Sequence, residues 1–136
     1  MRIRVFSIAL FAGLTLAASS AFACGDEPPL NLVASPATKT ALRTAYLLAH
    51  RAVDPTTVSG PVRGATYYGS YAGTEFAVAT FVTPGSAYPT IFERSGGQAW
   101  HAVRDTHGGV CTNQVPLELI HVWSLRHWGG RCYVER

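Results

Sequence analysis

The octapeptide EFAVATFV, residues 75–82, decides the fold of this 136-residue chain. Read as a strand, it places Phe76 and Val78 on one face and Ala77 and Phe81 on the other. Apolar side chains on both faces are typical of a strand at the centre of a sheet. We therefore expect residues 75–82 to form a central strand.

The segments around this strand have the composition of further strands. Thr, Val, Tyr and Phe are frequent from residue 65 to residue 104, and these residue types suit a pleated, half-buried surface. The predicted strands are residues 65–68, 75–82, 90–94 and 98–104, with turns at residues 69–73, 83–88 and 95–97. Because such short turns join antiparallel neighbours, we expect a three- to four-stranded antiparallel meander.

A helix is predicted before the meander. Ser35-Pro36 has the pattern of an N-cap followed by proline at the first helical position. Leu42 and Tyr46 then begin an apolar spacing typical of a helix, which Asp54-Pro55 ends after about 17 residues. Residues 35–53 are therefore expected to form an N-terminal helix with one apolar face.

A second, shorter helix is predicted near the C-terminus. Pro116 suits its first turn and Gly129-Gly130 its end, although Leu117 and the apolar residues after it also permit a strand. The fold class expected is α+β: an N-terminal helix, the meander, and a short C-terminal helix held by a disulfide. Both helices are expected to cover the same face of the sheet.

The N-terminus has the pattern of a secretory signal peptide. Arg2 and Arg4 precede an apolar run at residues 5–18, and Ala21-Phe22-Ala23 follows. The run is shorter than the about 20 residues that a transmembrane helix needs. We expect a signal peptide at residues 1–23, a flexible arm at residues 24–34, a single α+β domain at residues 35–136 and no transmembrane segment.

Cys24 leaves two forms of the exported protein open. It stands directly after the predicted cleavage site, where a bacterial lipoprotein carries its lipid, whereas Phe22 suits ordinary cleavage better. The chain is thus expected to be secreted or periplasmic, or else lipid-anchored through Cys24 at the outer face of a membrane. Without Arg2 and Arg4, nine basic residues face eight acidic ones. This balance argues against nucleic acid as a partner.

The other two cysteines are expected to form a disulfide. Export places Cys111 and Cys132 in a compartment where disulfides persist. Pairing them closes a segment of about 20 residues and stabilises the fold by roughly 3 kcal/mol. The alternative is a pair of reduced, buried thiols.

Four histidines fall close together in the sequence and raise the question of a metal site. They are His101, His107, His121 and His127. His101 and His107 are six positions apart, and so are His121 and His127. On a helix this spacing places His121 and His127 on opposite sides. We therefore expect no metal, no cofactor and no catalytic residue. A small extracytoplasmic enzyme or metal-binding protein using these histidines remains the alternative.

Aromatic residues suggest a binding surface instead. Tyr68 and Tyr71 flank the predicted turn at residues 69–73, and Arg126 and Trp128 lie near the predicted end of the C-terminal helix. Exposed aromatic and arginine side chains are frequent anchors of interfaces. These four residues are the predicted binding residues.

The C-terminal 40 residues carry a pattern of Trp, Gly, Pro and Cys. It runs through Trp100-His101-Ala102-Val103, Gly108-Gly109-Val110-Cys111, Val115-Pro116, Val122-Trp123 and Cys132. This pattern resembles that of small secreted proteins and lipoproteins of actinobacterial type, which have no known activity. The resemblance implies an exported, envelope-associated domain in which a disulfide closes the segment that contains a short Trp-bearing helix. The predicted function is a non-enzymatic module that binds a protein or a cell-wall polymer, a form that an inhibitor-like protein would also fit.

Overall fold

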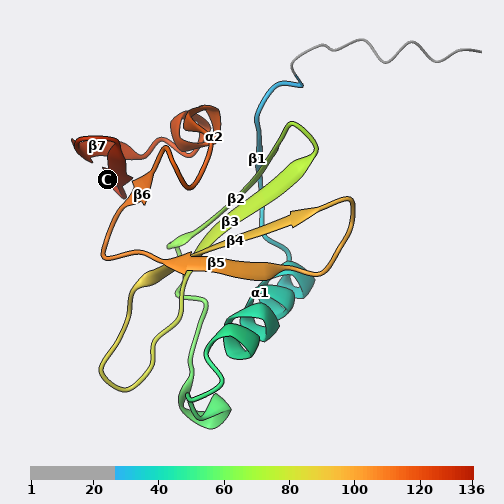
Figure 1. The fold of residues 1–136 in the computed structure, drawn as a ribbon, viewed down its shortest axis with the longest axis vertical. Coiled ribbons are helices and arrows are strands. Elements are labelled where there is room, and N and C mark those ends of the chain that lie inside the picture. The colour runs from blue at the N-terminus through green and yellow to red at the C-terminus, as the bar shows by residue number, and fades with distance from the viewer. Residues whose placement is uncertain (1–26) are drawn as a thin grey trace, which may run out of the picture.

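The computed structural model describes residues 27–136, so the predicted signal peptide and Cys24 lie outside the described residues. The described chain has an α+β fold with one N-terminal helix, a five-stranded antiparallel sheet and a small three-stranded sheet (Figure 1). No helix within these residues is both long and apolar enough to cross a membrane.

The strands are numbered in chain order. The large sheet has the order β1-β2-β3-β4-β5 and the small sheet the order β6-β8-β7. The elements are β1 (Leu30–Leu32), α1 (Pro36–Ala49), β2 (Thr66–Tyr71), β3 (Thr74–Thr80), β4 (Pro89–Ser95), β5 (His101–Asp105), β6 (Val110–Cys111), α2 (Leu117–Val122), β7 (Arg126–Gly129) and β8 (Cys132–Val134), with a single 3₁₀ turn at Pro55–Thr57.

Helix α1 begins where the sequence predicts and ends earlier. The Ser35 hydroxyl accepts a hydrogen bond from the Thr38 backbone N–H at 3.1 Å, and proline follows the cap. Leu42 and Tyr46 are buried against the sheet. The helix spans 14 residues and stops at Ala49, because the next residue, His50, leaves the helical conformation to bond with β5.

Strand β3 is central, as predicted, and its two faces belong to different apolar clusters. Ala77 and Ala79 lie in the cluster under α1, together with Phe92 of β4 and Phe81. Val78 lies in the other cluster, on the opposite face of the sheet. The alternation expected for residues 75–82 is therefore confirmed, and both faces are buried.

The two helices cover opposite faces of the large sheet, so the prediction that both cover one face is wrong. Helix α1 packs on one face, and α2 packs with the small sheet on the other, through Leu119, Ile120 and Trp123. Figure 1 shows the sheet between α1 (blue-green) and the C-terminal elements (orange to red). The physical reason is that Val78 and Ile91 need an apolar cover that α1 cannot supply from the other side.

The large sheet has five strands rather than three or four. The additional strand, β1, lies in the segment predicted as a flexible arm and pairs antiparallel with β2 at Leu30↔Ser70 and Leu32↔Tyr68. A Cβ at Gly69 would lie 2.5 Å from the Leu30 carbonyl oxygen, so only glycine permits this approach. At the other edge, the register between β4 and β5 shifts next to Phe92, which leaves Val103 without a partner on β4.

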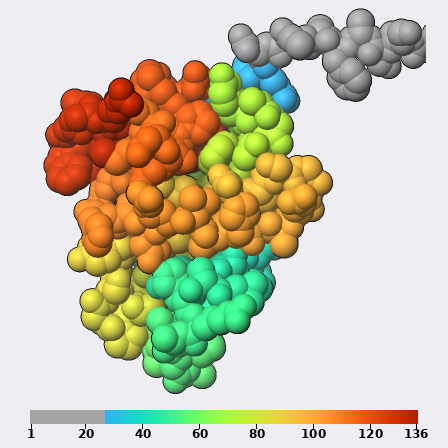
Figure 2. Space-filling view, in the orientation of Figure 1, coloured from blue at the N-terminus to red at the C-terminus, as the bar shows by residue number. Residues whose placement is uncertain are grey.

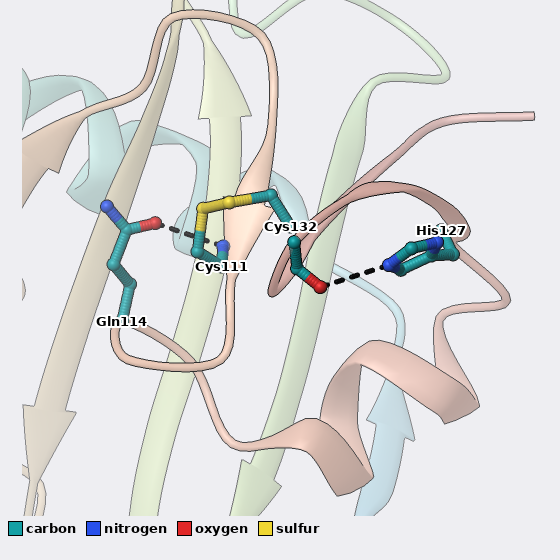
Figure 3. Close-up of a disulfide and its surroundings, with 5 residues drawn as sticks. Cys111, Gln114, His127 and Cys132 are labelled. Carbon is teal, nitrogen blue, oxygen red and sulfur yellow. Dashed lines mark hydrogen bonds between the residues drawn. A yellow bond between two sulfur atoms is a disulfide. The ribbon is translucent and has the colours of Figure 1, made fainter.

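The predicted disulfide between Cys111 and Cys132 is confirmed, but it joins two strands rather than holding a helix. The two residues lie directly opposite each other on β6 and β8, with a Cα–Cα distance of 3.9 Å. Figure 3 shows the bridge, with the Gln114 side chain accepting a hydrogen bond from the Cys111 backbone N–H at 3.0 Å. We call residues 110–134 the C-terminal unit.

Helix α2 is shorter than predicted. It ends at Val122, and Ser124 follows with a φ of 58°, the left-handed conformation that commonly terminates a helix. The chain then forms β7, and Gly129-Gly130 makes the turn into β8 instead of ending a helix. Because Leu125 is buried, the chain is drawn back to the sheet after α2 and cannot continue as a helix.

Candidate functional site

The two tyrosines predicted to flank an exposed loop do not form one. Strand β2 continues to Tyr71 and leaves only Ala72-Gly73 as the turn. Tyr68 is 8% exposed, and its ring packs edge-on against Trp100 with 5.7 Å between ring centroids. Tyr71 is half-buried beside the other apolar cluster. The prediction of an exposed recognition loop here is therefore wrong.

Tyr68 instead belongs to a polar network across the inner strands β2, β3 and β4. Its hydroxyl donates to the Glu75 carboxylate, which also accepts from the Arg94 guanidinium. Arg94 lies 4.8 Å above the Trp100 ring. The Arg94 hydrogen bond lowers the pKa of Glu75. This carboxylate is therefore ionised and fully engaged, which suits a structural role rather than acid catalysis.

The four histidines of the alternative site do not converge. They are His101, His107, His121 and His127. His101 Nε2 lies 3.0 Å from Glu93, the His107 ring meets Tyr88 edge-on, and His121 and His127 both face Tyr133. Among residues 27–136, no group of three or more His, Cys, Asp or Glu side chains could hold a metal ion.

The fifth histidine, His50, forms a half-buried polar cluster in which the Asp105 side chain is exposed. Its Nδ1 lies 2.8 Å from the Tyr46 carbonyl oxygen, and its Nε2 lies 2.7 Å from the Asp105 carboxylate. Asp105 also accepts from the buried Thr90 hydroxyl at 2.6 Å. The imidazole stacks on the Tyr46 ring at 4.1 Å. The cluster thus ties the end of α1 to β5.

The geometry of His50 fixes its charge. Both ring nitrogens face acceptors, and a neutral imidazole has only one N–H to donate, so both bonds form only in the imidazolium. Partial burial lowers the pKa of His50, but the hydrogen bonds to Asp105 and Tyr46 and the Asp105 charge outweigh it and raise the pKa. With both nitrogens engaged, His50 has no free nitrogen to act as a general base. The cluster therefore has a structural role, which is to hold the end of α1 against β5.

Trp128 is, with Arg126, one of the two predicted binding residues that the structure places on the surface. Its side chain is 66% exposed. The register of β7 with β8 shifts between His127 and Gly129, so Trp128 is an extra, bulged residue. A Cβ on Gly109 would lie 3.3 Å from the indole, so this glycine lets the ring rest on the backbone. Arg126 is exposed on the same short strand.

A groove of about 240 Å³ lies beside the Trp128 ring. Its floor includes the Cys111–Cys132 disulfide, and its polar lining includes Arg104, His107 and Gln114. The C-terminal residues, red in Figure 2, lie on one side of the orange band that contains β5, and α1 lies on the other. The groove therefore lies at the junction of β5 with the C-terminal unit.

The groove has a positive character. The Arg104 guanidinium makes no ion pair within residues 27–136. The one carboxylate of the lining, Asp105, is already bonded to His50 and Thr90. The guanidinium of Arg104, the His107 ring and the Gln114 side-chain NH₂ thus remain to meet a ligand, which can stack on Trp128.

Sequence reasoning found Trp128 and missed its surroundings. Arg104 and His107 come from β5 and the loop after it, more than 20 positions before Trp128, so no local spacing connects them. The one signal was Gly108-Gly109, which the sequence alone explains as a turn. Its second glycine also provides the close approach that the indole needs.

No family model, no curated protein and no solved structure matches this chain. The resemblance of its C-terminal pattern to small secreted proteins and lipoproteins therefore stays a prediction. The argument for function rests on the geometry of the described residues.

Proposed function

We propose that this chain is an exported, non-enzymatic binding module and that the Trp128 groove holds one unit of a cell-wall polysaccharide. The observation that carries the proposal is an indole ring that is largely exposed yet supported by Gly109 and the strand bulge. An aromatic ring fixed in this way presents an apolar face at little cost in conformational entropy.

The size of the groove favours a polymer over a free small molecule. Small-molecule sites usually measure about 300–1,000 Å³, and this groove measures about 240 Å³. It therefore suits a single ring of a longer chain that continues over the surface. The lining supports the same ligand, because Arg104, His107 and Gln114 offer hydrogen-bonding groups around an apolar ring face.

A polysaccharide is favoured over a protein partner. A protein interface typically takes about 800 Å² from each partner, with an apolar centre. The exposed large apolar side chains lie on separate elements, such as Leu48 on α1, Val103 on β5 and Trp128 on β7. The disulfide supports an extracytoplasmic location, because such cross-links persist outside the reducing cytoplasm.

Cosedimentation with insoluble cell-wall polysaccharide tests the proposal. We expect the wild-type protein to pellet with the polymer and Trp128→Ala to bind about 30-fold more weakly, the effect of losing about 2 kcal/mol at one anchor residue. The matched control is Leu48→Ala, which removes another exposed apolar side chain, on the opposite face of the sheet.

Iodide quenching of tryptophan fluorescence provides a second measurement. Trp100 and Trp123 are buried, so the quenchable emission comes from Trp128, and bound polymer should protect it. If Trp128→Ala pellets as well as wild type, the groove is not the site. If the wild-type protein binds no wall polysaccharide, the ligand is of another class and a protein partner becomes the better explanation.

A further inference from the structure

A second cavity, of about 200 Å³, lies between the large sheet and the C-terminal unit. Its walls come from both parts and are largely apolar, including Val78 of β3, Val110 of β6 and Leu125. An apolar cavity of roughly 150 Å³ is enough to bind benzene. This cavity is therefore large enough for a compact ring with a short substituent.

The polar lining of the cavity includes an interacting pair of side chains. Tyr67 and Glu135 both line it. Partial burial and the negative charge of Glu135, with which Tyr67 forms a hydrogen bond, raise the pKa of Tyr67. The phenol therefore stays protonated and donates this hydrogen bond to the Glu135 carboxylate. The bond positions the carboxylate beside the cavity.

Thr106 adds an observation that points to an occupant. The residue is 4% exposed and lines the cavity, and its buried hydroxyl has no hydrogen-bond partner within residues 27–136. Buried hydroxyls nearly always have a partner, so an orphan is evidence for a group that is not part of the chain. Thr106 lines the Trp128 groove as well, so a ligand or water in either hollow would supply that partner.

The charge of the lining selects the ligand. Glu135 has the only carboxyl group among the residues that line the cavity, and no Lys, Arg or His side chain lines it. Tyr67 and Tyr133 also line the cavity, and aromatic rings attract cations. A ligand with a positive end and an apolar body would satisfy the carboxylate and fill the space between the valines and Leu125.

We propose that this cavity is a second binding site, for a small organic ammonium compound with a compact apolar body. It is distinct from the Trp128 groove, because the two share only Thr106 and Gly109 among their lining residues. The ammonium group lies at Glu135, and the apolar body lies against Val78, Val110 and Leu125. This proposal does not depend on the polysaccharide function.

The test is a titration of the folded chain with benzylamine, followed by amide chemical shifts in NMR. Benzyl alcohol and benzoate, of similar size, are the neutral and anionic comparison probes. We expect saturable shifts around the cavity with a Kd of about 1 mM for benzylamine, as suits a ligand of this size. Benzyl alcohol should bind about 10-fold more weakly, and benzoate should give no saturable shift.

Two variants assign the binding to the cavity. Glu135→Gln should weaken benzylamine binding about 10-fold and leave benzyl alcohol unaffected, whereas the control Glu118→Gln, on the exposed part of α2, should change neither. Ala65→Leu adds side-chain volume to the cavity lining from a half-buried position directly before β2, and it should abolish binding of both probes.

Three results would overturn the proposal. No saturable shift with benzylamine up to about 20 mM, far above the Kd expected for such a ligand, would show that the cavity takes no ligand of this class. Equal affinity for benzylamine and benzyl alcohol would exclude selection by charge. Unchanged binding in Ala65→Leu would place the probe elsewhere on the protein.

Discussion

Removing the Cys111–Cys132 disulfide should destabilise the whole fold by an amount that the chain length predicts. The bridge spans a sequence separation of 21 residues. The loop-closure entropy of a segment that long corresponds to about 3.3 kcal/mol at 25 °C. For a domain of about 110 residues this loss lowers the Tm by roughly 13 °C. Because the bridge joins β6 to β8, the loss begins in the small sheet.

The experiment compares Cys111→Ser/Cys132→Ser with the parent chain, both with Cys24→Ser so that no third thiol interferes. Urea unfolding is followed by far-UV circular dichroism and by tryptophan fluorescence. The double variant should unfold at about 2 M less urea, given a typical dependence on denaturant for this size. Reductant should shift the parent to the same midpoint and leave the double variant unchanged.

The shape of the two transitions also reports on the structure. Trp123 packs in the cluster under the C-terminal unit, and Trp100 packs in the cluster under α1. Coincident transitions would mean that both layers unfold with the sheet. A free energy of unfolding within about 0.5 kcal/mol of the parent's, the usual effect of a neutral surface change, would refute the reasoning. The closed loop would then contribute nothing to stability.

Three further substitutions test the packing described above. Folding raises the pKa of His50, so its stabilisation is fully present below its unfolded pKa of about 6.5 and fades as pH rises through the folded pKa; the free-energy gap between wild type and His50→Gln in urea unfolding should therefore be wider at about pH 5.5 than at about pH 8.5. Gly69→Ala places a Cβ 2.5 Å from the Leu30 carbonyl oxygen, so it should cost about 2 kcal/mol or more and release the β1 amides to fast hydrogen exchange. Phe92→Ala empties a fully buried site and should cost about 3–5 kcal/mol in calorimetry, and a loss under 1 kcal/mol would contradict the two-sided core.

The local sequence pattern was enough to predict the main helix and the central strand. It was not enough to predict which face of the sheet each helix covers. Alternation along residues 75–82 and the Ser35-Pro36 cap depend on neighbours in sequence, and both predictions were confirmed. Strand β1 has three residues, too few for a period to be visible, and it pairs only because Gly69 admits the Leu30 carbonyl. The face that α2 covers depends on which side of the sheet lacks a cover, and this is a property of the assembled fold.

In the candidate site, too, some features could be predicted from local sequence and others depend on the assembled fold. The exposure of Trp128 agrees with its place near a turn, and the burial of Tyr68 was missed because β2 ends at Tyr71, three residues later than its composition indicates. His50 and Asp105 lie 55 positions apart, and no spacing rule joins them. Such pairs are found only when the fold brings α1 against β5.

The unpaired Val103 on β5 has a consequence for self-association. An edge strand with a continuous row of free backbone groups is a template for another chain, and a bulge or a charged side chain disrupts that template. Strand β5 has both, since Arg104 and Asp105 follow the bulge, and the opposite edge, β1, is only three residues long. Both edges of the sheet therefore resist strand addition, and the native fold should withstand high concentration without forming β-aggregates.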